Sequence, residues 1–258
     1  MRLMKRILSA AAVLALSASL LVGCSSGTAS SVPVSASSAA ESTVSSVEET
    51  ASSAVDENEA AAAQLLNDLT GSYQELWPVI LADEYKQTWL DDCTALVGED
   101  NAEAAFEKLS SMVTGDVYGE DAVKAYANGG GAYFCGFTNS LAILTFDGET
   151  STISGTDKDG NVLFSHTYHY IGMEPVHELY EFESDDADSG EFTYFFLAPD
   201  TSAETYHIEF RYGSDAEALS QYDAGKYAYW LASGISTDCD QTMIDNCIEL
   251  FCTENLAG

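Results

Sequence analysis

The sequence predicts a β-dominated α+β fold, in which an antiparallel β-barrel or sandwich follows a group of helices and precedes a final helix. Seven short stretches between residues 133 and 212 are rich in aromatic and β-branched residues and are separated by turn signals. The flanking regions 59–128 and 239–254 instead repeat their apolar residues at helical spacing. Seven evenly spaced strands are typical of a barrel or a sandwich.

The region before the strands is predicted to be helical because its apolar residues recur every three or four positions. In 59–70, for example, Leu65, Leu66 and Leu69 form one stripe, and Gly71 is a stop signal. The predicted helical segments are 59–70, 71–98, 102–113 and 117–128, and three glycines at 129–131 follow the last of them.

The strands are predicted from alternation with a period of two. Asp147-Gly148 and Asp159-Gly160 are hairpin signals between them. The predicted strands are 133–137, 141–146, 150–154, 162–173, 177–183, 191–199 and 205–212. A helical turn at 215–222, an aromatic segment at 226–232 and a helix at 239–254 complete the chain.

The last predicted strand, 205–212, has one apolar and one polar face. The apolar face is expected to pack on the core. The polar face consists of Thr205, His207, Glu209 and Arg211. We expect any binding site of this protein to include that polar face.

The N-terminus has the features of a secretory signal. Three basic residues within 1–6 precede an apolar run at 7–22, which is too short and wrongly flanked for a stable membrane span. The following Leu-Val-Gly-Cys at 21–24 resembles a bacterial lipobox, and this resemblance implies cleavage after residue 23 and lipidation of Cys24. The alternative is an uncleaved anchor helix. Either interpretation places the body of the protein on the outer side of the cell membrane and anchored to it.

Residues 24–58 contain Ser, Ala, Thr, Val and Glu in large amounts and no aromatic residue. Such a composition cannot bury enough apolar surface to offset chain entropy, so we expect a disordered tether. Residues 59–258 are long enough for a single domain with a sizeable core.

The chain is strongly acidic, with a net charge of −33. Removal of 1–23 takes away three of the nine basic residues and none of the 42 acidic ones, so the mature charge is −36. This field repels nucleic acids and anionic lipids and concentrates cations near the surface. Solubility outside a cell is the simpler explanation of the charge. Nucleic-acid binding is excluded.

Five cysteines follow Cys24, namely Cys93, Cys135, Cys239, Cys247 and Cys252. An extracytoplasmic location permits disulfides, but the odd number leaves at least one thiol unpaired within the chain. The chain has no C-x-x-C pair. It also lacks the G-x-S-x-G, H-E-x-x-H and phosphate-loop patterns, so we predict that it is not an enzyme.

Two segments resemble a known family. The segment 191–236 contains TYHIEFRYG, then a short helix and GKYAYWLASGIS; together with GSYQELWPVILADEY at 71–85 it resembles the ZinT (YodA-like) domain. This family comprises lipocalin-like extracytoplasmic domains that recruit zinc, some of them fused to the binding lipoproteins of zinc transporters. The resemblance implies a calycin-like barrel over 59–258, zinc as the ligand, and a zinc-uptake transporter as a partner.

The resemblance also implies positions for the metal ligands. Three family histidines fall at or near Phe195, at Thr205 and at His207, so one of the three is a histidine here. A zinc site needs three or four ligands. The replacement candidates are Glu209, on the same strand face as His207, together with His166, His169 and His177. Because His166 and His169 are three residues apart in one strand, they point to opposite faces and only one can join His207.

The sequence therefore favours a membrane-anchored lipoprotein that captures a divalent transition metal, zinc above others, and hands it on. The alternative is a calycin-like module without metal, which binds a small organic ligand or a protein partner. In that case the tyrosine-rich mouth of the barrel would form the site, with Tyr168, Tyr170, Tyr194, Tyr206 and Tyr212.

Overall fold

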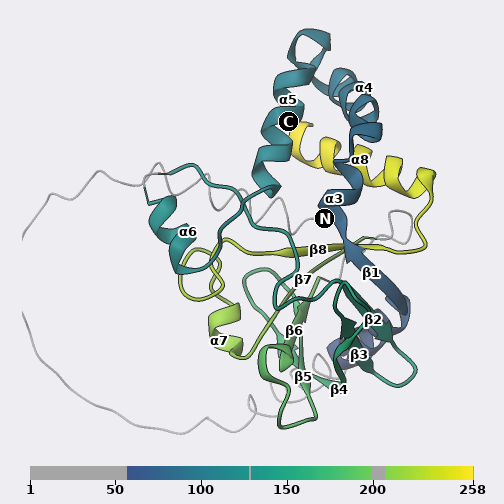
Figure 1. The fold of residues 1–258 in the computed structure, drawn as a ribbon, viewed down its shortest axis with the longest axis vertical. Coiled ribbons are helices and arrows are strands. Elements are labelled where there is room, and N and C mark those ends of the chain that lie inside the picture. The colour runs from purple at the N-terminus through teal and green to yellow at the C-terminus, as the bar shows by residue number, and fades with distance from the viewer. Residues whose placement is uncertain (1–56, 128, 199–206, 258) are drawn as a thin grey trace, which may run out of the picture.

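The computed structural model describes residues 57–127, 129–198 and 207–257. Within them, eight antiparallel strands form a closed barrel in which each strand pairs with its neighbours in sequence and β1 pairs with β8 (Figure 1). The strands are β1 (Gly71–Glu75), β2 (Ile143–Asp147), β3 (Thr152–Thr156), β4 (Val162–Met173), β5 (Tyr180–Ser184), β6 (Tyr194–Leu197), β7 (His207–Gly213) and β8 (Ala232–Ser236).

The helices gather mainly at one end of the barrel, where α3, α4, α5 and α8 lie together (Figure 1). A further helix covers 57–68 and leads into β1. The bounds are α3 (Leu76–Ile80), α4 (Lys86–Val97), α5 (Glu99–Val113), α6 (Glu120–Ala125), α7 (Ala216–Leu219) and α8 (Gln241–Leu256), with 3₁₀ turns at Asp83–Tyr85 and Gly190–Phe192. Asp240 begins α8 because its side chain accepts a hydrogen bond from the Met243 backbone N–H.

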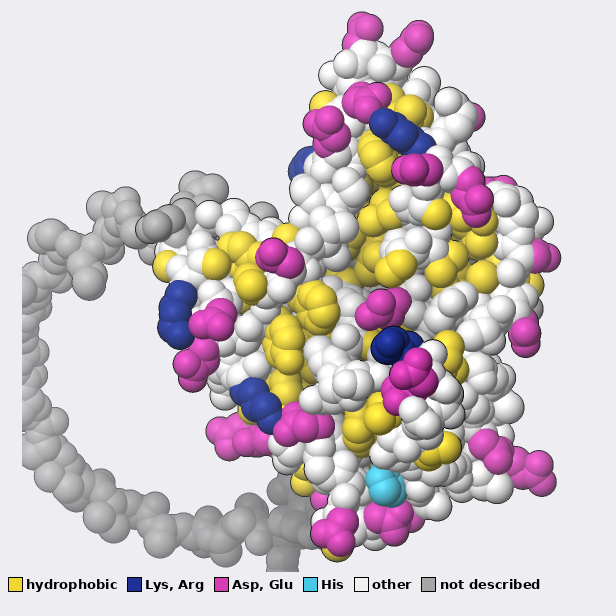
Figure 2. Space-filling view, in the orientation of Figure 1, with side chains coloured by type: hydrophobic (Ala, Val, Ile, Leu, Met, Phe, Trp, Pro, Cys, Tyr) yellow, Lys and Arg dark blue, Asp and Glu magenta, His cyan; other side chains and the backbone are white. Residues whose placement is uncertain are grey.

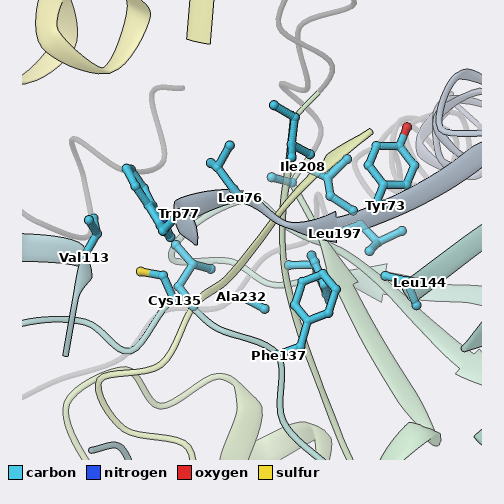
Figure 3. Packing of buried hydrophobic residues seen from close by; sticks show 14 of the residues in the cluster. Tyr73, Leu76, Trp77, Val113, Cys135, Phe137, Leu144, Leu197, Ile208 and Ala232 are labelled. Carbon is cyan, nitrogen blue, oxygen red and sulfur yellow. The ribbon is translucent and has the colours of Figure 1, made fainter. Parts of the chain in front are cut away.

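Aromatic rings fill the barrel. The Phe164 ring on β4 lies 5.9 Å from the Phe195 ring on β6, and Phe195 lies 5.4 Å from Tyr212 on β7. Since β4 does not pair with β6, these rings meet across the interior. Figure 3 shows Ile208 of β7 and Leu144 of β2 in the same buried cluster. Even positions of β7 therefore face inward, and His207, Glu209 and Arg211 face outward.

The predicted barrel class is confirmed, and most predicted elements correspond to observed ones. The strand predicted at 162–173 has the bounds of β4. Three assignments were wrong. Residues 71–75 form β1 instead of a helix, 232–236 form β8, and 133–137 form an irregular segment in which Phe134 makes isolated bridges to Thr114 and Trp230. The residues of β1 begin a stretch with helical spacing, and those of β8 carry one large apolar side chain, so neither shows the alternation of a strand. Both are strands because each completes the ring of hydrogen bonds.

Several predictions fall outside the described residues. These are the signal peptide 1–23, Cys24, the tether up to residue 56, and Thr205 and Tyr206 at the start of the last predicted strand. Within the described part, no helix has the length and apolar character that crossing a membrane requires. Figure 2 shows acidic side chains spread over the visible face, which also carries a few basic ones.

Candidate metal site beneath helix α8

The outer face of β7 is covered by helices. Every residue of β7 is buried, although its alternation predicted one face open to a ligand. Leu76 and Trp77 of α3 and one side of α8 pack over His207 and Glu209. The rings of Trp77 and Phe251 meet edge to face at 4.8 Å and hold the two helices together above the strand. His207 and Glu209 consequently lie in a closed layer between the barrel and the helices.

A small cavity remains in this layer. Its volume is about 20 Å³, which is room for one water molecule or one ion. Four of its residues carry groups that can bind a metal, and the other four are apolar. The lining consists of His207 and Glu209 with Cys247 and Glu254, and of Leu76, Trp77, Leu250 and Phe251.

The Glu209 carboxyl lies in this cavity with an unusual environment. The residue is 5% exposed, and its Oε2 atom has no hydrogen-bond partner among the described residues. Burial, reinforced by the negative charge of Glu254, raises the pKa of Glu209 to about 7. A buried carboxyl that keeps an unpaired oxygen is costly, and either a proton or a cation relieves that cost.

His207 has the opposite shift. Burial disfavours its charged form and lowers the pKa of the imidazole to about 4. His207 is therefore neutral at physiological pH, as a metal-ligating imidazole must be. Burial also raises the pKa of the neighbouring Cys247 thiol to about 12, so this sulfur stays protonated unless a cation replaces its proton.

Two lining residues, Cys247 and Glu254, were not predicted as site residues. Both lie on α8, where Cys247 and Glu254 share one helix face with Leu250 and Phe251. A carboxylate in line with an otherwise apolar stripe was the sequence signal that could have revealed Glu254. This signal can be interpreted only when it is known that the stripe covers β7, which lies about 40 residues away in sequence.

The other predicted ligands lie elsewhere. His166 and His169 face opposite sides of β4, as predicted, and each has a carboxylate partner from the loop after β5. His166 Nδ1 lies 2.8 Å from Asp186, and His169 Nδ1 lies 2.7 Å from Asp185. β4 is three strands from β7 in the barrel, so neither histidine joins His207.

His177 lies in the connection between β4 and β5 and is buried. Its ring centroid is 3.7 Å from that of Tyr222, and its Nδ1 is 3.3 Å from Glu174 Oε2. Glu174 also accepts the backbone N–H groups of Val176 and His177. These contacts fix the connection, so His177 has a structural role in this arrangement.

The described residues hold no group of three or more His, Cys, Asp or Glu side chains arranged to bind a metal. Of the five predicted ligands, the structure brings together His207 and Glu209 and separates His166, His169 and His177. Phe195, aligned with a family histidine, pairs with Tyr212 and faces the barrel interior, the side opposite His207. A side chain at Phe195 therefore cannot reach the cavity.

Of the five tyrosines in the alternative prediction, Tyr170 and Tyr194 are half-buried and Tyr206 lies outside the described residues. Tyr168 and Tyr212 are buried among the interior rings. A different groove, of about 330 Å³, lies outside the barrel. Figure 3 shows Trp77, Val113 and Cys135 side by side at this place. The rest of its lining is Glu75, Pro78, Leu81, Thr114, Gly115, Phe134 and Gly136.

Comparisons with known proteins give the following. No protein family and no curated protein matches the chain. Among solved structures, the zinc-bound ZinT-like domain of Streptococcus pneumoniae AdcA is similar, with a TM-score of 0.45 and 15% identity over 71% of this chain and 89% of that domain. Zinc-bound AdcA from the same organism has a TM-score of 0.43 and 14% identity over 72% of this chain, which spans 35% of AdcA. The first of these structures is a ZinT-like domain, and segments 71–85 and 191–236 resemble that family.

Proposed function

We propose that this protein binds a divalent transition metal ion, zinc above others, in the cavity beneath α8, and that it captures and hands on the ion without catalysing a reaction. His207 and Glu209 are the protein ligands of this proposal. The observation that carries it is the Glu209 carboxyl, which is buried beside a neutral imidazole and has an oxygen with no partner among the described residues.

The donor types in the cavity favour a transition metal over calcium or magnesium. Imidazole nitrogen and thiolate sulfur suit zinc, whereas calcium and magnesium prefer oxygen ligands alone. His207 and Glu209 supply two ligands, and zinc needs at least one more. We propose that the ion draws the Glu254 carboxylate or the Cys247 sulfur of α8 towards it, with water in any remaining position.

Titration calorimetry of the full-length chain, prepared without a polyhistidine tag, tests this proposal. We expect one zinc ion per chain, and we expect His207→Ala and Glu209→Gln each to weaken binding at least about tenfold. His169→Ala is the matched control, because His169 is an exposed histidine already paired with Asp185. Zinc must displace the proton of Glu209, so the affinity of the protein for zinc should also fall as pH drops below about 7.

Two results would contradict the metal site. One is zinc binding that is equal in the wild type, His207→Ala and Glu209→Gln. The other is weak uptake of several ions that disappears in 0.5 M salt, roughly where the Debye length is only a few Å, because that is the behaviour of an acidic surface.

We propose the outer face of the cell membrane as the place of action, on the strength of the N-terminal sequence and its lipobox-like Cys24. A zinc-uptake transporter is the proposed recipient of the ion. Cys24→Ala should move the protein from the membrane fraction to the soluble fraction. Retention of the variant in the membrane fraction would count against lipid anchoring.

The 330 Å³ groove supports a second candidate function, the binding of a small organic ligand. Its volume and its lining by Trp77, Leu81 and Phe134 suit an apolar body. Its charged side chain is Glu75, whose Oε1 accepts the Phe137 backbone N–H at 2.6 Å. A negative group beside an aromatic wall, in a strongly acidic protein, favours an apolar amine over a carboxylic acid.

Calorimetric titration with tryptamine and indole-3-acetate as a matched pair tests this second candidate. We expect tryptamine to bind and indole-3-acetate not to bind. Glu75→Gln should weaken tryptamine binding about tenfold, through loss of a charge-assisted contact, and Leu81→Trp should block it by filling the groove. Leu96→Trp, at an exposed leucine outside the groove, is the control. Equal binding of both probes would rule out recognition by Glu75.

A further inference from the structure

Two buried thiols lie against each other in the helical region. The Sγ atoms of Cys93 and Cys252 are 3.9 Å apart, and both residues are inaccessible to solvent. A disulfide has a sulfur–sulfur distance of about 2 Å, so bond formation requires the two atoms to approach by about 2 Å. The two cysteines are separated by 159 residues of sequence, so this contact is a product of the tertiary fold.

The pair joins two different helices. Cys93 lies on α4 and Cys252 on α8, and the packing around them is aromatic. The Trp89 ring of α4 is 5.9 Å from the Phe251 ring of α8, and the Trp89 indole N–H donates to the Ile80 carbonyl at 2.7 Å. The Trp89–Phe251 contact joins α4 to α8, and the hydrogen bond to Ile80 of α3 fixes the Trp89 ring. α8 is also the element that covers His207 and Glu209.

We propose that Cys93 and Cys252 form a disulfide that fastens α8 to α4. The inference does not depend on metal binding. This disulfide would pair two of the five cysteines that follow Cys24. Cys135, Cys239 and Cys247 would remain thiols. Cys135 and Cys247 are buried at other places, beside the Tyr133 carbonyl and in the α8 cavity respectively.

The reaction is thiol–disulfide exchange with a disulfide donor, such as a dithiol oxidoreductase of an oxidising compartment. One cysteine thiolate attacks the donor disulfide and forms a mixed disulfide, releasing one donor sulfur as a thiolate. The second cysteine thiolate then attacks the bound cysteine sulfur and releases the other donor sulfur. Both cysteines are oxidised, the donor is reduced to two thiols, and the two cysteine protons pass to the donor sulfurs.

The burial of both thiols predicts when the bond forms. An attacking thiolate must reach the donor, and neither sulfur is accessible once α8 has docked. We therefore expect oxidation while the chain folds, and slow oxidation of a chain that has already folded in the reduced state.

Peptide mapping of the full-length chain, refolded with oxidised and reduced glutathione, tests this proposal. Cleavage after glutamate places Cys93 and Cys252 in separate peptides without any other cysteine, since Glu84 and Glu99 flank Cys93, and Glu249 and Glu254 flank Cys252. Free thiols are alkylated before digestion. We expect peptides 85–99 and 250–254 to appear as one species, 2 Da lighter than their sum on the basis of two lost hydrogens, and to separate on reduction.

Stability gives a second readout. The bond closes a long loop, so reduction should lower the melting temperature of the wild type by about 5–10 °C. Cys252→Ser should not respond to reductant, and Cys239→Ser, the control at a half-buried thiol, should respond as the wild type does. Recovery of 85–99 and 250–254 as separate alkylated peptides after refolding would overturn the proposal, as would a stable linkage of either to another cysteine.

Discussion

Replacing Arg211 by alanine is expected to cost about 4 kcal/mol of unfolding free energy, which is the largest effect we expect from a single substitution. The guanidinium is buried and donates to the backbone carbonyls of Leu219, Gln221 and Tyr227. Its Cζ atom also lies 4.2 Å from the centre of the Tyr222 ring. The alanine variant leaves these carbonyls without their donor and opens a cavity against the ring. For a domain of this size, the melting temperature should fall by about 10 °C, as monitored by circular dichroism.

Lys226→Ala is the matched control for removal of a positive charge. Its ammonium lies 2.6 Å from Glu191, but half of its side chain is exposed. An exposed ion pair contributes little because water screens it, so we expect a loss below about 1 kcal/mol. If Arg211→Ala cost no more than Lys226→Ala, Arg211 would not be the clamp of the 219–227 segment. The structure therefore assigns Arg211 to stability, although its strand position predicted a place on a binding face.

The second large effect concerns how the folding stability depends on pH. Glu209 and His207, in the cavity beneath α8, change it in opposite directions. Folding raises the pKa of Glu209 from 4.5 to about 7, so the folded protein holds a proton that the unfolded chain releases. The stability that this proton confers is lost as pH rises from about 4.5 to 7. Folding lowers the pKa of His207 from 6.5 to about 4, so its contribution is instead lost as pH falls from about 6.5 to 4.

Substitution of each group by glutamine, which does not titrate, separates the two contributions. Relative to the wild type, Glu209→Gln should gain about 3 kcal/mol of stability between pH 4.5 and 7, because it lacks the carboxyl that must lose a proton. His207→Gln should lose a similar amount, relative to the wild type, between pH 4 and 6.5. Urea unfolding at a series of pH values measures both. The expected slopes have opposite sign, and two difference curves of the same sign would contradict the burial of one of these groups.

The control for this pair is Glu217→Gln, which removes one negative charge from an exposed position on α7. It accounts for the general effect of lowering the net charge of an acidic protein. Addition of zinc supplies a further comparison, because an ion bound to Glu209 replaces its proton. In the presence of zinc, the stability of the wild type should therefore no longer decrease between pH 4.5 and 7, where Glu209 otherwise lowers it.

The secondary structure of the barrel could be predicted largely from local patterns. The 12 residues of β4 alternate between a buried side with Phe164 and Tyr168 and an exposed side with Ser165, Thr167 and His169, and the sequence shows this alternation directly. The opposite orientation of His166 and His169 followed from the same period. The period of a strand and its turn residues are properties of a few neighbouring positions, so they can be recognised without knowledge of the partner strand.

The closing strands could not be predicted in this way. The residues of β1 begin a stretch with helical spacing, and β8 carries only one large apolar residue, Ile235. They are strands because β1 pairs with both β2 and β8, and β8 pairs with β7. Hydrogen bonds between segments far apart in the sequence, such as Tyr73 of β1 and Ser236 of β8, leave no local signal in it.

The candidate site, too, could be predicted from the sequence only in part. The sequence by itself determined that His207 and Glu209 share one side of a strand, because side chains alternate with a period of two. Only the tertiary structure decided that α3 and α8 bury this side, that Cys247 and Glu254 join it, and that His166, His169 and His177 do not. Alternation fixes which residues are neighbours on a face, whereas long-range packing of apolar surface determines what covers that face and thereby shifts its pKa values.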